Sequence, residues 1–224
     1  MTRSRRHSPP TPSAASSLVG LAVLGLALMS CAQDGSTAPG EPLLSREARP
    51  AVSQGEAQTY AAQLRPLNGA FSYRPVQGIA NFKIKDGVLT VRVNASGLQP
   101  GMPHAQHVHM ASGCPSPGDD GGDGIVSLGD GVPFFGPVLF WLDGDLATPG
   151  PDPTTLPNPD NAGGAITFMA SGSVADLEAA LGGPLDLANR TVVLHGVAAG
   201  TDLSADPAAA AAPAGLPVAC GVVN

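Results

Sequence analysis

The chain has 224 residues, of which 18 are acidic and 11 are basic, and it contains five histidines and three cysteines. This length fits one domain of roughly 160 residues with an N-terminal extension. The acidic excess argues against nucleic-acid binding and against a basic membrane-surface patch, because both depend on positive charge.

The first 30 residues have the pattern of an export signal. Three arginines precede an apolar run, residues 18–28, that is too short to span a bilayer. The run ends in Leu28-Met29-Ser30-Cys31, which resembles the lipobox of bacterial lipoproteins. The resemblance implies cleavage before Cys31, lipid attachment to it, and anchoring on the extracytoplasmic side of a bacterial envelope membrane. The alternative is an ordinary secretory signal with an incidental cysteine.

The exported chain would contain one pair of cysteines and a larger acidic excess. With Cys31 lipidated, Cys114 and Cys220 remain. In an oxidising compartment an even number of cysteines predicts a disulfide, with two free thiols as the alternative. Loss of the signal would also leave 8 of the 11 basic residues against 18 acidic ones, a formal charge of −10.

The composition of the remaining chain changes near residue 58. Residues 31–58 are rich in small and polar residues and lack apolar periodicity, which is typical of a flexible tether. Residues 59–224 consist of short apolar runs separated by turn residues. We therefore expect a signal peptide (1–30), a tether (31–58) and one β domain (59–224).

The β domain is expected to contain short strands and little helix, which predicts an all-β sandwich or barrel. Asp86-Gly87 predicts a tight hairpin between two apolar runs. Residues 173–182 begin with serine, a good N-cap, and end with glycine, a common stop signal, which predicts a short helix. Long loops are expected at 112–164, interrupted by 134–142, and at 198–217. Strands are expected at 60–67, 77–85, 88–94, 104–109, 165–170 and 190–195, and around Cys220.

Histidines are the candidate functional residues of this domain. Residues i and i+2 of a strand share a face, so His107 and His109 can offer two imidazoles to one metal ion. His195 lies in another strand-like run and would supply a third imidazole if the two strands were neighbours. His104 is an odd number of residues from His107 and should face away. The alternative is that all are ordinary surface or core residues.

In the order and spacing of these motifs the chain resembles the copper/zinc superoxide dismutases, chiefly their exported bacterial branch. The family's Gly-Leu-x-Pro-Gly lead into His-x-x-His-x-His is similar to residues 97–101 followed by 104–109, with one extra residue between. Cys114 follows at the spacing seen in bacterial members. Residues 190–195 resemble the strand of the last copper histidine, and residues 219–222 resemble the C-terminal Ala-Cys-Gly-Val.

This resemblance implies a superoxide dismutase-like fold, a Greek-key barrel or sandwich of about eight strands with long loops. It also implies a role for each matching residue. These are copper ligation by His107, His109 and His195, an intrasubunit disulfide between Cys114 and Cys220, and a structural role for His104.

The sequence departs from the family at the zinc site. No histidine lies between His109 and His195, so the bridging histidine and the other zinc histidines have no counterpart. Leu142 stands where a zinc histidine would be, and Gly144-Asp145-Leu146 resembles only the segment with the zinc aspartate. One carboxylate cannot make a tetrahedral zinc site. We therefore expect copper and no zinc.

A second departure concerns the substrate. Pro217 stands where the family has its catalytic arginine, and the loop 198–215 contains two aspartates and no lysine. Residues 119–123 add three more aspartates. Negative charge slows the approach of an anionic substrate. We therefore expect superoxide dismutation to be weak or lost.

Three other functions remain open from the sequence. The first is a non-enzymatic envelope module that holds copper or exchanges it with a donor or acceptor. The second is a CHRD domain, whose strand, Gly-Leu and His-x-His layout resembles residues 67–109 but does not account for the strand of His195. The third is a structural surface domain without metal.

Overall fold

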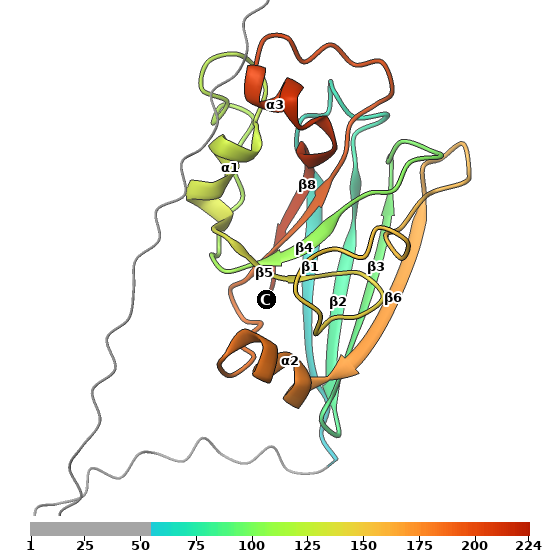
Figure 1. Cartoon of the computed structure of the whole chain (residues 1–224), viewed down its shortest axis with the longest axis vertical. Helices are drawn as coiled ribbons and strands as arrows, with labels where there is room; N and C mark the ends of the chain where they lie inside the picture. Colours follow the sequence, from blue (N-terminus) through green and yellow to red (C-terminus); the bar gives the residue numbers. More distant parts are fainter. Residues whose placement is uncertain (1–54) are drawn as a thin grey trace, which may run out of the picture. The chain divides into compact units, whose positions relative to one another are not determined.

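The computed structural model describes residues 55–224, and strands dominate this part of the chain (Figure 1). The predicted signal peptide, the lipidation site Cys31 and the tether up to residue 54 lie outside the described residues. No helix within residues 55–224 has the length and apolar character needed to cross a membrane. The strands are β1 (Gln58–Pro66), β2 (Gln77–Lys85), β3 (Val88–Ser96), β4 (Gln106–His109), β5 (Val138–Trp141), β6 (Ile166–Ser173), β7 (Thr191–His195) and β8 (Pro217–Val222). The helices are α1 (Leu128–Phe135), α2 (Val174–Leu181), α3 (Pro207–Ala211) and a 3-10 turn, Pro213–Gly215.

All eight strands belong to one antiparallel sheet in the order β5-β4-β7-β8-β1-β2-β3-β6. The sheet curls into a half-barrel, with β5 and β6 as its two edges (Figure 1). Successive strands β3 and β4, and likewise β6 and β7, lie in opposite halves of the sheet, so their connections cross from one half to the other. The prediction of an all-β barrel or sandwich with about eight strands is confirmed.

The hairpin of β2 and β3 shows why this half of the sheet forms. Asp86 and Gly87 both have positive φ, 50° and 76°, which is the backbone of a tight turn whose twist matches the strands. Alternate residues of β3, Leu89, Val91 and Val93, are fully buried against the main core. This alternation fixes the register, because a slip of one residue would expose all three.

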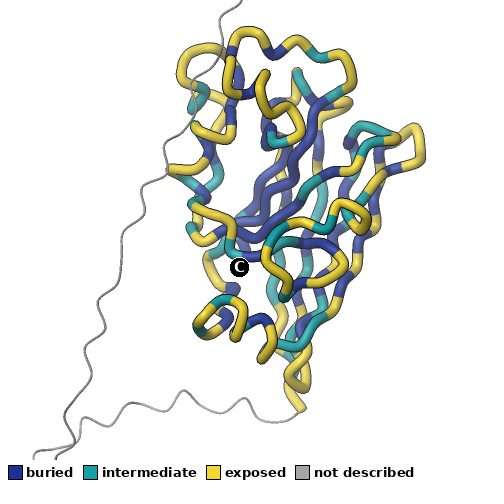
Figure 2. Tube along the Cα trace, in the orientation of Figure 1, coloured by how far each residue is buried: buried dark blue, intermediate teal, exposed yellow. Residues whose placement is uncertain are grey.

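The other half of the sheet is covered on both faces. Every residue of β4 and β7 is buried (Figure 2). Val108 and Val192 face the main core, whereas Val193 packs with Phe135 of α1 on the opposite face. The loops that contain α1 and α3 therefore enclose a second buried layer outside the barrel core.

The predicted helix is confirmed, and two further helices form where the sequence predicts loops. In α2, Ser173 caps the first turn and Gly182 ends the helix in the left-handed conformation. α1 was not predicted because its glycines and Pro133 are poor helix formers. It is stabilised by a capping box, in which Ser127 and Asp130 satisfy each other's backbone N–H groups.

Candidate metal centre

The three histidines proposed as ligands meet on the outer face of β4 and β7. These strands are antiparallel neighbours, with His107 opposite Val193. His195, two residues after Val193, therefore lies close to His107 and His109. One ligand atom of each imidazole lies within 4.8 Å of the others. In residues 55–224, His107, His109 and His195 are the one such group of three or more His, Cys, Asp or Glu side chains.

Two of the three rings are oriented by backbone carbonyls. Nδ1–H of His109 donates to the carbonyl oxygen of Gly136 at 2.8 Å, and Nδ1–H of His195 donates to that of Gly215 at 2.7 Å. Gly136 ends α1 and Gly215 ends the 3-10 turn, so the two covering loops supply both acceptors. This hydrogen bond leaves Nε2 of each ring with a free lone pair, as a metal ligand requires.

The remaining ring nitrogens have no partner. Nε2 of His109, Nε2 of His195 and both nitrogens of His107 are buried without a hydrogen bond among the described residues. The three side chains are only 7%, 2% and 1% exposed for His107, His109 and His195. A buried polar atom without a partner costs about 1–3 kcal/mol. A metal ion bound by these nitrogens would remove that cost, so the residues fit one.

The electrostatics favour neutral imidazoles. Burial, with smaller contributions from His195 and His109, lowers the pKa of His107 to about 2. Burial also lowers the pKa of His195 to about 4, against the opposing effect of the Gly215 carbonyl. The pKa of His109 is lowered by burial as well. All three rings are therefore unprotonated at neutral pH, which is the form that binds metal.

Two aromatic side chains flank the histidines. Trp141 of β5 is the cross-strand partner of His107, and the two ring centroids are 3.9 Å apart. Phe135, the last residue of α1, packs against His109 with centroids 4.5 Å apart. Neither residue was expected at the site from the sequence. The β4–β5 pairing that places Trp141 beside His107 carries no local sequence signal.

His104 lies outside the cluster of three histidines and supports it by contacting the backbone of His195. Its ring nitrogens lie 2.9 Å from the carbonyl oxygens of His195 and Gln99. Gly196 leaves the space for this ring, because a Cβ at that position would come within 2.2 Å of His104 Nδ1. His104 therefore contacts the backbone of a candidate ligand without being one.

The predicted disulfide is present and lies beside the same layer. Cys114 and Cys220 are bonded, joining the loop after β4 to β8. Cys220 is the cross-strand neighbour of Val193, which in turn is opposite His107. The cross-link therefore ties the loop that covers the histidines to the strand beside them.

The residues that resembled a zinc segment lie elsewhere. Leu142 is fully buried in the main core. Asp145 is exposed in the turn after β5, where the Thr148 hydroxyl and the Ala147 N–H donate to its carboxylate and lower its pKa. Neither side chain joins the histidine cluster.

No protein-family model and no curated protein sequence matches this chain. The covering segments 111–137 and 196–216 are acidic, since together they contain six aspartates and no lysine or arginine.

Proposed function

We propose that this domain is an exported copper-binding module of superoxide dismutase-like design, with one ion held by His107, His109 and His195. The observation that supports this most strongly is the set of buried, neutral imidazole nitrogens without partners. Two of these rings are already fixed in the ligating tautomer by Gly136 and Gly215.

Copper suits this donor set better than the common alternatives. Magnesium and calcium take oxygen ligands, and a structural zinc site needs four protein ligands. Three imidazoles with so little exposure leave little room for the water that would complete a zinc or Cu(II) site. Three-coordinate Cu(I) needs no further ligand. Bound copper would supply one-electron redox chemistry, while the chain's part is to hold and enclose it.

Superoxide dismutation, giving oxygen and hydrogen peroxide, is at most a weak activity in this proposal. The covering segments contain six aspartates and no lysine or arginine, so they carry a net negative charge that disfavours the approach of an anion. The same charges attract cations, which favours copper storage or exchange with a donor or acceptor protein.

Export and lipid anchoring remain part of the proposal. The lipobox-like sequence at Cys31 supports attachment to the outer side of a membrane. The disulfide Cys114–Cys220 independently supports export, because such bonds persist in oxidising compartments.

A copper titration tests the function. Residues 55–224 would be titrated with Cu(I) under a competing chelator, with zinc as a parallel ligand. We expect one copper per chain, loss of binding in His109→Ala and His195→Ala, and unchanged binding in Lys83→Gln, an exposed β2 residue. Absence of copper binding would leave the structural or CHRD-like surface domain, and tighter binding of zinc would reverse the choice of metal.

A further inference from the structure

One of the three candidate ligands is held differently from the other two. His109 and His195 each donate Nδ1–H to a carbonyl oxygen. His107 has no such acceptor, and both of its ring nitrogens are buried without a polar partner. If one of them faces the metal, the other still carries a proton that must point at something.

Trp141 lies next to His107, on the side away from His195. The strand order β5-β4-β7 places Trp141 and His195 on opposite sides of the β4 histidine. The centroids of His107 and His195 are 4.7 Å apart, and those of His107 and Trp141 are 3.9 Å apart. The two nitrogens of an imidazole point in nearly opposite directions, so a ring that turns one toward His195 turns the other toward Trp141.

The angle between the rings agrees with this arrangement. The planes of His107 and Trp141 are 79° apart, so one ring presents its edge to the other's face. The face of an aromatic ring is electron-rich and accepts N–H donors weakly.

We propose that the indole face of Trp141 accepts the ring N–H of His107, so that Trp141 is the positioning residue for this ligand. The indole orients the ring of His107, as the carbonyl oxygens of Gly136 and Gly215 orient the rings of His109 and His195. The proposal rests on the copper-binding function, since it concerns one of the three ligands of that site.

The exchange of an acceptor oxygen for an aromatic face has a consequence for the metal. A strong acceptor raises the basicity of a ligating histidine, and an aromatic face does so less. His107 is therefore the weakest metal ligand of the three histidines. It is also the most exposed of them, at 7%.

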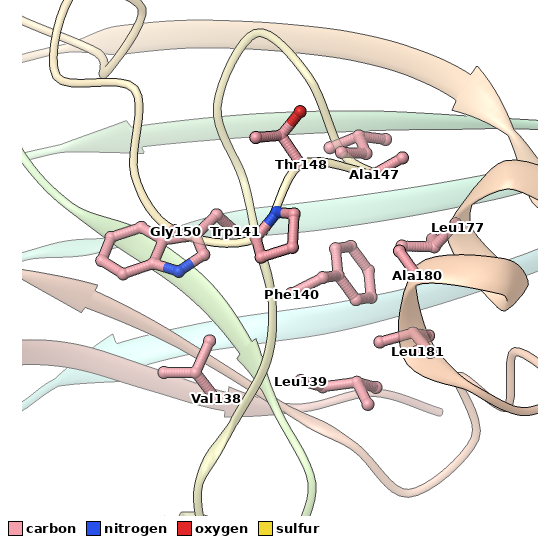
Figure 3. Close-up of a pocket in the computed structure, with 12 residues that line it drawn as sticks. Val138, Leu139, Phe140, Trp141, Ala147, Thr148, Gly150, Leu177, Ala180 and Leu181 are labelled. Atoms are coloured by element: carbon pink, nitrogen blue, oxygen red, sulfur yellow. The ribbon is translucent and has the colours of Figure 1, made fainter.

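Trp141 also borders a pocket beside β5. Trp141 lines a pocket of about 220 Å³ between β5, the turn 146–150 and α2 (Figure 3). No histidine is among the residues that line this pocket.

The metal-free domain provides a test that does not depend on copper. In ¹⁵N-histidine-labelled protein, the ring N–H signals of His109 and His195 serve as internal references for carbonyl hydrogen bonds. We expect the His107 N–H signal to be shifted upfield of both by the ring current of the indole. A His107 signal as far downfield as the references, or none at low temperature, would overturn the proposal.

Two variants separate the aromatic face from side-chain bulk. Trp141→Phe should keep most of the upfield shift, and Trp141→Leu should lose it. For Cu(I) affinity we expect a loss of about tenfold in Trp141→Leu, as for removal of other groups that orient a ligand, and wild-type affinity in Trp141→Phe. Equal shifts in all three proteins would contradict the proposal. If Trp141→Leu does not fold, the wild-type and Trp141→Phe spectra still decide it.

The two parts of the experiment fail separately. An upfield His107 signal in a protein that binds no copper would refute the proposed function and leave the contact with Trp141 established. Copper binding with an unshifted signal would do the reverse.

Discussion

His104 Nδ1 lies 2.9 Å from the backbone carbonyl oxygen of His195, so a buried histidine that is not a candidate ligand supports one that is. The contact exists because Gly196, the next residue, has no side chain in the space that the His104 ring occupies. The backbone at Gly196 also has a φ of 147°, which favours glycine.

Gly196→Ala should therefore damage both stability and the metal site. The new Cβ would come within 2.2 Å of His104 Nδ1. We expect the free energy of unfolding to fall by at least about 2 kcal/mol, measured by urea denaturation, with weaker copper binding. Gly183→Ala is the matched control, because a Cβ there meets nothing within 4 Å. Equal stability of the two variants would show that the His104 ring is not held against Gly196.

Acid should destabilise the metal-free protein. The folded-state pKa values of His107 and His195, about 2 and about 4, lie below the ordinary 6.5. Below pH 6.5 the unfolded chain gains protons on these rings that the folded chain does not, so unfolding becomes easier as pH falls from there toward 4. Each histidine contributes up to about 1.4 kcal/mol per pH unit.

The contribution of His107 to this pH dependence of stability can be isolated with one variant. In urea denaturation at pH 7 and pH 5, His107→Gln should lose less stability than the wild type over this range. The same loss in both proteins would mean that His107 is protonated normally in the folded state.

Removal of the disulfide should cost more than any single surface change. The two cysteines are 106 residues apart, and closing a loop of that length contributes about 4–5 kcal/mol in the chain-entropy model. We expect a loss of this order in Cys114→Ser/Cys220→Ser, measured by urea denaturation. Cys31→Ser leaves the pair intact and should match the wild type. A loss below about 1 kcal/mol would contradict the entropic account.

Any residual reaction with superoxide should respond to salt in a characteristic direction. Added salt screens the repulsion between superoxide and the six aspartates of segments 111–137 and 196–216. The rate of superoxide consumption by the copper-loaded domain should therefore rise with ionic strength. A rate that falls with salt would indicate attraction and a positively charged approach that these segments do not contain.

The sheet was predictable because its signals are local. Asp86-Gly87 defines a turn by its own backbone preferences, and the alternation of β3 follows from one buried face. Helix α1 was not predictable, because its glycines and Pro133 disfavour a helix that only the fold stabilises. Its C-terminal Phe135 packs against His109, a contact between residues far apart in the chain.

The candidate site likewise has parts that local sequence signals predict and parts that depend on the fold. His107 and His109 share a strand face by parity, and His195 was found by its strand-like context and by resemblance. The carbonyls of Gly136 and Gly215 could not be predicted, since every residue has a carbonyl and only the fold selects these two. Trp141 depends on the β4–β5 register, which the sequence does not encode locally.

X-ray absorption at the copper edge tests the convergence of three imidazoles on one ion most directly. The domain loaded with one equivalent of Cu(I) should show nitrogen ligands with the outer-shell scattering of imidazole, and His195→Ala should lose one of them. Sulfur or oxygen ligands in the wild type, or an unchanged spectrum in His195→Ala, would contradict the assignment.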